Sequence, residues 1–143
     1  MIYISRREHF NAAHRIFKDG LTDAENYARF GACSNPNWHG HNYTLYVTVK
    51  GEPDPDSGYV MDLKKLSMII KEKIIDKVDH KNMNLEVDFM KGIQPSAENM
   101  AIAVFNVLAP EIERYNACLH SIKLAETDNN YVEYFGKQHD KSR

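Results

Sequence analysis

Two long stretches of alternating apolar and polar residues limit the fold most strongly, because a period of two residues is typical of half-buried β-strands. Apolar residues stand at even positions over residues 2–16 and at odd positions over residues 39–51. The two sets are Ile2, Ile4, Phe10 and Ala12, and Tyr43, Leu45, Val47 and Val49. We predict two long strands joined by a polar connection, residues 17–38, whose length is uncommon for a loop without a function.

The second half of the chain predicts two helices and then a β-hairpin. Asp62 and Ser96 are each placed to cap a helix; the first helix runs to residue 78, and Pro110 should end the second or start another turn. Their apolar sides are Leu63, Leu66, Ile70 and Ile74, and Met100, Val104, Val107 and Leu108. Alternation returns over residues 118–126 and 130–135, which a polar turn separates, and the tail from residue 137 is expected to fray.

The order β-β-α-α-β-β predicts an α+β fold, in which a four-stranded antiparallel sheet carries two helices on one face. Such a sheet leaves its edges open, so we expect it to close by association with other copies of the chain. A length of 143 residues fits one domain, residues 1–143.

Charge and hydropathy exclude several classes of protein. The net charge of −2 argues against a nucleic-acid binder, and no apolar run approaches the roughly 20 residues that cross a membrane. The first residues lack the basic and then apolar order of a signal peptide, so a cytoplasmic protein is expected. Cys118, in an apolar stretch, should be a buried thiol, whereas Cys33 lies in a polar loop.

Three histidines fall on the predicted inner faces of the two long strands. His39 and His41 are two positions apart, so their imidazoles point to one side, about 6–7 Å apart along the strand. Such a pair alone is often two surface histidines, but this pair shares the parity of the apolar residues, and His14 ends the apolar face of the first strand. A catalytic zinc typically takes three protein ligands and leaves one position open, so the pattern predicts a zinc site.

Three further positions carry chemistry whose role spacing alone leaves open. Cys33 precedes His39 by six residues, so its thiol is either a base whose pKa the metal lowers or itself a ligand. Asp79 and His80 form an acid–base relay or, as spacing alone favours, a capped turn with a solvated histidine. Glu126 can accept two hydrogen bonds from the guanidine-like edge of a heterocycle, or it is an ordinary acid at a strand end.

Five short motifs occur in order along nearly the whole chain. They are residues 10–15 (FNAAHR), 31–43 (GACSNPNWHGHNY), 78–82 (VDHKN), 96–99 (SAEN) and 125–130 (AETDNN). Together they resemble the 6-pyruvoyl-tetrahydropterin synthase family, which includes the bacterial 6-carboxy-tetrahydropterin synthases. The resemblance implies the tunnelling (T-fold) architecture: trimers close an antiparallel barrel, two trimers stack into a hexamer, and active sites form between subunits.

The resemblance also implies a role for particular residues. The implied zinc ligands are His14, His39 and His41. The implied catalytic residues are Cys33 as the thiol and Asp79 and His80 as its partners. The implied substrate-binding residues are Glu126, which anchors the pterin ring, and a second segment of Ser96, Ala97 and Glu98.

The implied reaction converts 7,8-dihydroneopterin triphosphate to 6-pyruvoyl-tetrahydropterin and triphosphate, with Zn²⁺ and with Mg²⁺ as a candidate companion of the triphosphate. The alternative within the family is 6-carboxy-5,6,7,8-tetrahydropterin synthase of queuosine biosynthesis. Five residues separate Cys33 from His39, which resembles the pyruvoyl-forming members, since the carboxy-forming enzymes typically have three. A non-catalytic zinc- or pterin-binding module remains an alternative of a different class. A carbonic-anhydrase-like hydratase is disfavoured, because Cys33 and Glu126 would have no role in it.

The chain departs from the family pattern in two places. Trp38 stands where the animal enzymes have glycine, and Ser96-Ala97 stands where they have two threonines. The first change would narrow the mouth of the site, and the second removes a side-chain hydroxyl. Both departures put the substrate preference in doubt more than the type of reaction. Arg15 and Lys18 are candidates for the triphosphate, chosen for their nearness to His14 in the sequence.

Overall fold

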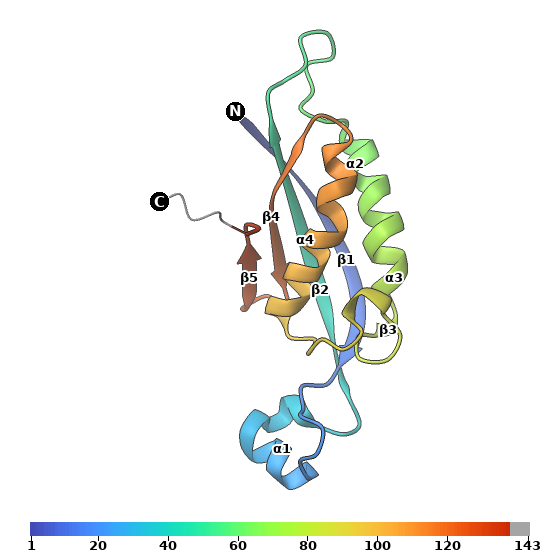
Figure 1. Ribbon diagram of the computed structural model, residues 1–143, viewed down its shortest axis with the longest axis vertical. Helices are drawn as coiled ribbons and strands as arrows, with labels where there is room; N and C mark the ends of the chain where they lie inside the picture. The colour runs from blue at the N-terminus through green and yellow to red at the C-terminus, as the bar shows by residue number, and fades with distance from the viewer. Residues whose placement is uncertain (138–143) are drawn as a thin grey trace.

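A five-stranded sheet with helices on one face forms the body of the protein in the computed structural model, which describes residues 1–137 (Figure 1). The strands lie in the order β3-β1-β2-β4-β5. Their bounds are β1 Ile2–His14, β2 His39–Gly51, β3 Lys81–Asn82, β4 Cys118–Ala125 and β5 Tyr131–Tyr134. The α+β class and the face that the helices share are as predicted, and the tail beyond Lys137 falls outside the described residues.

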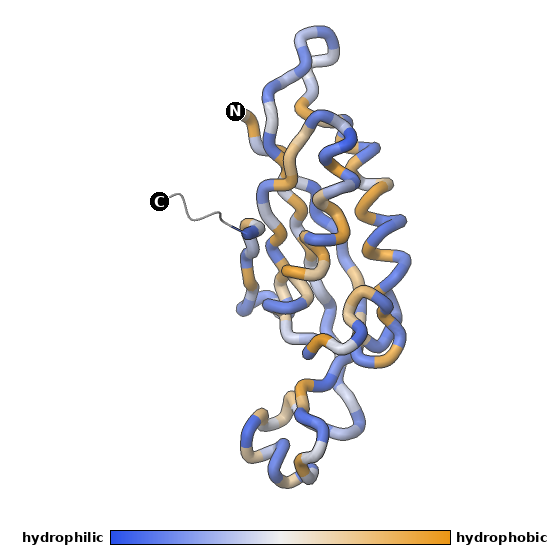
Figure 2. The backbone as a smooth tube through the Cα atoms, in the orientation of Figure 1, coloured by the Kyte–Doolittle hydropathy of each residue, from blue (hydrophilic) through white to orange (hydrophobic). Residues whose placement is uncertain are grey.

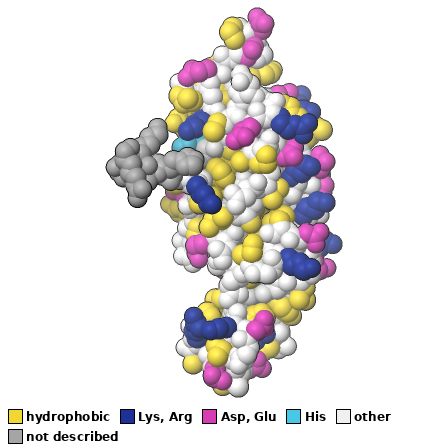
Figure 3. Space-filling model, viewed as in Figure 1, with side chains coloured by type: hydrophobic (Ala, Val, Ile, Leu, Met, Phe, Trp, Pro, Cys, Tyr) yellow, Lys and Arg dark blue, Asp and Glu magenta, His cyan; other side chains and the backbone are white. Residues whose placement is uncertain are grey.

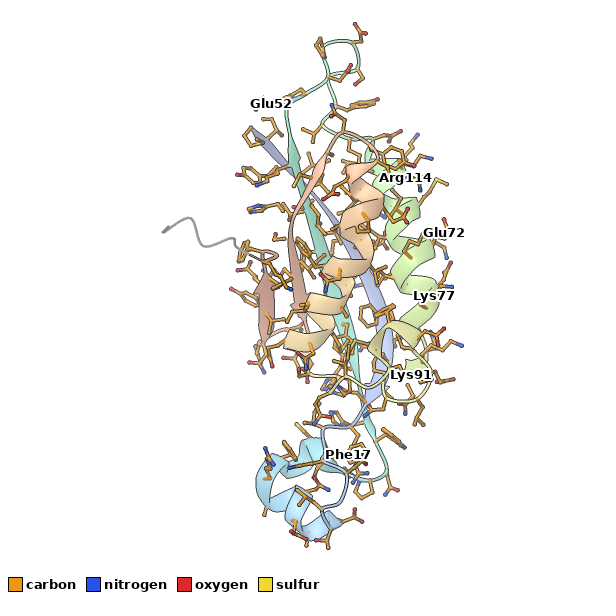
Figure 4. The ribbon with its side chains drawn as sticks, in the orientation of Figure 1. Phe17, Glu52, Glu72, Lys77, Lys91 and Arg114 are labelled. Carbon is orange, nitrogen blue, oxygen red and sulfur yellow. The ribbon has the colours of Figure 1, made fainter. Side chains whose placement is uncertain are left out.

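The first of the two predicted helices is a continuous helical stretch with an irregular middle. It comprises α2 (Leu63–Ile70), the π-helical turn η2 (Lys71–Ile75) and α3 (Asp76–Val78). Asp62 caps it as predicted, because its Oδ1 accepts the N–H of Lys64 at 2.9 Å. Glu72 and Lys77 lie on its side away from the sheet (Figure 4), and charged side chains line this edge of the molecule (Figure 3).

The second predicted helix, α4 (Ala97–Glu113), is longer than the sequence indicated. Ser96 caps it as predicted, with its Oγ accepting the N–H of Asn99 at 3.2 Å. The prediction that Pro110 ends it is wrong, because Pro110 lies inside the helix with its ring exposed. The buried side continues beyond it to Ile112, so packing holds the last turn in place.

The pairing of β1 with β2 is the longest in the sheet. It runs without interruption from Ile2 opposite Gly51 to His14 opposite His39. The first strand was predicted to reach residue 16 and instead ends at His14, where the chain leaves the sheet and returns to it at His39. β2 also pairs with β4, with a shift in register between Thr48 and Val49.

The core lies between the sheet and the two helices. The predicted inner positions Phe10 and Ala12 of β1 and all four of β2 are buried, together with Leu66, Ile70 and Ile74 of the first helical stretch and Leu108 of α4. Ile2 and Leu63 were predicted to be buried and are exposed, and Ile4 is partly buried. Hydrophobic residues recur along both helices and the strands (Figure 2). No helix among residues 1–137 is long and apolar enough to cross a membrane.

The sheet and the long connection both contain elements that the sequence did not predict. The short β3 runs parallel to β1 at Ala12 and Ala13, so the sheet has five strands where four were predicted. The long connection contains α1 (Asp23–Phe30) and the 3₁₀ turn η1 (Gly31–Ser34), where only a loop was predicted. α1 begins with a capping box between Thr22 and Glu25, a signal that the sequence analysis missed.

Cys118 was predicted to be buried and is exposed. The register shift between Thr48 and Val49 sets Cys118 opposite Lys50 and Leu119 opposite Val49. Because Leu119 occupies the inner position, Cys118 points to the face that no helix covers.

The α1 segment forms a lobe below the sheet (Figure 1), and Arg15 joins it to the strands. The Arg15 side chain donates to the carbonyl of Ser34 at 2.8 Å, approaches Asp23 at 3.4 Å and lies 4.1 Å from the centre of the Phe17 ring. Phe17 lies at the root of the lobe (Figure 4). A guanidinium with these partners holds the lobe against the end of β1.

Removal of the Leu45 side chain tests the core. Leu45 is fully buried, so Leu45→Ala should lower the free energy of unfolding by about 2–5 kcal/mol through lost burial and a residual cavity. Leu85, which is 70% exposed, provides the matched control: Leu85→Ala should change it by less than about 0.5 kcal/mol. Urea denaturation of both variants measures the difference, and equal losses would contradict the assigned core.

Candidate metal centre and active site

Three imidazoles converge at the lower end of the β1–β2 pair. His14 is opposite His39 in the register, and His41 follows two residues later on the same face of β2. The ring centroids lie 4.5 Å apart for His14 and His39, 5.1 Å for His14 and His41, and 5.0 Å for His39 and His41. The structure therefore brings together all three of the predicted zinc ligands.

His14 is held in one orientation by groups that the sequence analysis did not identify. Its Nδ1 donates to the carbonyl of Pro95 at 2.8 Å, which leaves the lone pair on Nε2 facing the other histidines. The Tyr43 hydroxyl lies 3.5 Å from the same Nδ1, and the Tyr43 ring stacks on Phe10 with centroids 4.8 Å apart. Tyr43 continues the parity of His39 and His41, which was the only sequence signal for its place here.

Burial keeps the three histidines neutral. Loss of solvation lowers the pKa of His14, His39 and His41 below the usual value of about 6.5, and neighbouring imidazoles lower the pKa of each further. Glu126 opposes this effect, but loss of solvation is the larger cause in each case. Neutral imidazoles are the form that binds a metal ion.

Glu126 is the fourth member of this cluster. Its Oε1 lies 2.9 Å from His41 Nε2 and 3.8 Å from His14 Nε2. One donor atom from each of the four residues lies within 4.8 Å of the others, so the cluster could hold a metal ion. The ring atoms His14 Nε2, His39 Nδ1 and His41 Nε2 are buried without a hydrogen-bond partner, and three nitrogens with one carboxylate fit a zinc-type site.

The catalytic and substrate-binding residues implied by the resemblance take different places around the cluster. Cys33 lies in η1 with an exposed side chain and is not in the group of four donors, so its role as a ligand gains no support. Ser96 and Ala97 begin α4 directly after Pro95, the residue that orients His14. Glu98 is exposed in the first turn of α4.

Asp79 and His80 lie at the outer edge of β1. The Asp79 carboxylate accepts the backbone N–H of Asn11 at 2.9 Å, and Asn11 in turn accepts the N–H of His80. The second carboxylate oxygen of Asp79 lies 3.0 Å from His80 Nδ1. The Asn11 hydrogen bond, and then His80, lower the pKa of Asp79. The pair therefore has the geometry of a relay, although the His80 side chain is 76% exposed in the single chain.

Two hollows flank the cluster. The larger, with a volume of ≈ 530 Å³, lies beside His80 and is lined by Asn11, Ala13 and Asn42, among others. The other, of ≈ 270 Å³, is bordered by Phe17, Trp38 and Gln94. Trp38 has a φ of 69°, which strains a large side chain directly before His39. Glycine would take this conformation without strain.

The chain matches one known protein family over almost its whole length. The model of the family described as 6-pyruvoyl tetrahydropterin synthase matches residues 3–137. The chain belongs to this family. The family predicted from the sequence is thereby confirmed. The relatives named below are synthases.

Relatives of this family resemble the chain over almost its whole length. It is 41% identical to the 6-pyruvoyl tetrahydrobiopterin synthase of Homo sapiens over 134 residues, which is 94% of this chain and 91% of the human protein. The structure of Caenorhabditis elegans 6-pyruvoyl tetrahydropterin synthase superposes with a TM-score of 0.86 at 39% identity, covering 95% of this chain and 96% of that one. The 6-carboxy-5,6,7,8-tetrahydropterin synthase of Rickettsia conorii is 28% identical, covering 93% and 99%. The T-fold prediction is therefore confirmed for the single chain.

The buried histidines should make the metal-free protein sensitive to acid. Unfolded histidines take up protons below about pH 6.5, whereas the folded cluster takes them up only at lower pH, so stability falls as the pH falls below that value. His41→Gln should weaken this dependence, while His9→Gln, an exposed residue outside the cluster, should leave it unchanged. Urea denaturation at pH 7.5 and pH 5.5 checks the slope; a loss of stability toward high pH would contradict it.

Proposed function

We propose that the protein is a zinc-dependent 6-pyruvoyl-tetrahydropterin synthase that converts 7,8-dihydroneopterin triphosphate to 6-pyruvoyl-tetrahydropterin and triphosphate in the cytoplasm. The observation that carries the proposal is the convergence of three neutral histidines and Glu126 in a member of this family. Mg²⁺ would accompany the triphosphate.

Different members of the cluster would bind the zinc ion and the pterin ring. His14, His39 and His41 would hold the zinc, with Pro95 fixing the orientation of His14. Bound zinc supplies a Lewis acid that acidifies the C–H and O–H groups beside the hydroxyls of the substrate side chain. Glu126 would accept hydrogen bonds from the amino-pyrimidinone edge of the pterin, and the segment Ser96, Ala97 and Glu98 would border the ring.

Proton transfer falls to residues around the cluster. The Cys33 thiolate would remove the carbon-bound proton of the side chain, and His80 would carry protons while Asp79 orients it through the 3.0 Å contact to Nδ1. Cys33 follows the lobe between the strands, whereas Asp79 and His80 lie at the outer edge of β1. Their separate places favour an active site to which two chains contribute.

The open edge of β1 supports an assembly of this kind. β3 covers β1 only at Ala12 and Ala13, so no strand among residues 1–137 pairs with the outer edge of β1 from Ile2 to Phe10. A second chain that pairs there would bring its own residues beside Asp79 and His80. We therefore propose the trimer, and the dimer of trimers, in which sheets join edge to edge into a barrel.

The carboxy-forming activity is the second candidate. The five residues between Cys33 and His39, together with higher identity to relatives named as pyruvoyl-forming enzymes, favour the first reaction. Purified protein incubated with dihydroneopterin triphosphate should yield 6-pyruvoyl-tetrahydropterin by mass. A 6-carboxy product with acetaldehyde would contradict the proposed reaction and support the second candidate.

The zinc requirement has its own test. Removal of metal with a chelator should abolish turnover, and added Zn²⁺ should restore it. Full activity without metal would contradict the proposed zinc dependence.

The two cysteines offer a matched test of the thiol. Cys33→Ala should lower kcat by about 10²–10⁴-fold, because the base that takes the carbon-bound proton is lost. Cys118 is also exposed but lies on the uncovered face of the sheet, so Cys118→Ala should keep full turnover. Zinc content, measured in both variants, should not change. Full turnover of Cys33→Ala would remove the thiol from the mechanism and favour a module without catalysis.

A proline in β1 tests the proposed edge pairing. The backbone groups of Asn11 point outward, so by alternation the N–H of Arg7 does too. Arg7→Pro removes that N–H and should shift the protein toward single chains, whereas Arg7→Ala keeps it and should leave the assembly unchanged. Size-exclusion chromatography with light scattering measures the masses. An unchanged mass for Arg7→Pro would place the contact elsewhere.

A further inference from the structure

The turn that carries Cys33 is attached by its backbone carbonyls to the residues that follow β1. The carbonyl of Cys33 accepts the N–H of Ile16 at 2.9 Å, and the carbonyl of Ser34 accepts the Nε–H of Arg15 at 2.8 Å. Ser34 is 2% exposed, and its hydroxyl donates to the carbonyl of Gly31 at 2.8 Å. The exposed thiol therefore lies on a fixed backbone, and the Arg15 side chain provides one of the two attachments.

The guanidinium of Arg15 is placed for the Ser34 carbonyl more than for an ion pair. The Arg15 side chain is only 13% exposed, and a charged group that leaves water to this extent needs partners. The Asp23 carboxylate lies 3.4 Å away and is 75% exposed, so solvent weakens that contact. The hydrogen bond to Ser34 is shorter, and the ring of Phe17, at the root of the lobe (Figure 4), lies 4.1 Å from the guanidinium carbon. The carbonyl and the ring together fix the direction of the side chain.

Asn84 fixes the backbone of Arg15. Its Oδ1 accepts the N–H of Arg15, and its Nδ2 donates to the carbonyl of Arg15, both at 2.9 Å. The preceding residue, Met83, donates its N–H to the carbonyl of Ala13 at 2.8 Å, which ties this segment to β1. The Arg15 side chain therefore extends from a backbone that is held one residue beyond the end of the strand.

We propose that Arg15 is a positioning residue for the Cys33 thiol and that it acts through the carbonyl of Ser34 without touching the substrate. This inference rests on the thiol base of the proposed function and adds the residue that holds the base in place. Proton transfer from carbon depends on the distance between the base and the carbon, and a misplacement of about 1 Å can lower a rate by about 10²-fold. A turn attached only to the lobe would not hold the thiol within that tolerance.

Kinetics separate this role from direct binding of the triphosphate. Loss of a group that binds substrate and transition state equally raises KM, whereas loss of a group that acts only on the reaction lowers kcat. Arg15→Met keeps a long apolar side chain and removes the donor, so kcat should fall by about 10²-fold. KM for 7,8-dihydroneopterin triphosphate and the zinc content should stay near those of wild type. A raised KM with unchanged kcat would overturn the inference and make Arg15 a ligand of the triphosphate.

Asp23→Asn is the matched control, because it removes the charge that the same guanidinium approaches and leaves the bond to Ser34 in place. Its kcat should stay within about twofold of wild type, since an ion pair with a carboxylate that is 75% exposed contributes little. A loss equal to that of Arg15→Met would assign the effect to the ion pair and overturn the role of the Ser34 carbonyl.

A double variant separates this inference from the proposed function. If Arg15 acts through the thiol, Arg15→Met should lower kcat no further once Cys33 is replaced by alanine, because the two residues act as a unit. Equal fold losses with and without the thiol would overturn the inference and leave the thiol and the zinc synthase intact. Full turnover of Cys33→Ala alone would overturn the thiol base and, with it, this inference.

Should Arg15→Met fold poorly, Arg15→Lys decides in its place. Lysine keeps the charge and a donor but lacks the planar group that bonds to Ser34 and stacks on Phe17 together. Its kcat should fall while KM and the zinc content stay unchanged. A wild-type kcat for Arg15→Lys would then overturn the positioning role.

Discussion

The antiparallel pairing of β1 with β2 is the interaction on which the rest of the structure depends. It sets His14 opposite His39 and turns His41 to the same side, so two strands bring three imidazoles together without help from a loop. The same alternation buries the apolar residues against the helices, and core packing therefore also fixes the imidazoles. Pro95, which directly precedes the N-cap of α4, also fixes the orientation of His14 through its carbonyl. Folding of the sheet and convergence of the three histidines are thus one event.

Most of the fold could be predicted because alternation and helix caps are local signals. The inner face of β2, the part of β1 near Phe10 and Ala12, and the caps Asp62 and Ser96 were predicted correctly. The errors arise where distant parts of the chain decide: Cys118 is exposed because of a register shift in a neighbouring strand, and β3 exists only because β1 lies beside it. Pro110 stays helical because packing beyond it outweighs the missing N–H. Only α1 had a local signal, its capping box, that was overlooked.

The candidate site could be predicted to a smaller extent. The histidines share a period with the core, so their convergence could be inferred from the sequence. The contacts of Pro95 and Glu126 with them join residues 81 or more positions apart, and no pattern along the chain indicates them. The geometry of Asp79 with His80 is fixed by the edge of β1, where the Asp79 carboxylate accepts the backbone N–H of Asn11. Cys33 and the substrate residues keep the roles that the family resemblance gives them.

Parity in the two strands has a consequence for how such a protein can change over generations. The gain or loss of one residue in β1 or β2 would turn every following side chain to the opposite face and scatter the histidines. The lobe between His14 and His39 is free of this constraint, since lengthening a loop adds little entropic cost. Heritable variation in length can thus collect in the segment that carries Cys33 and Trp38. The chemistry at the mouth of the site can diversify while the metal geometry is inherited unchanged.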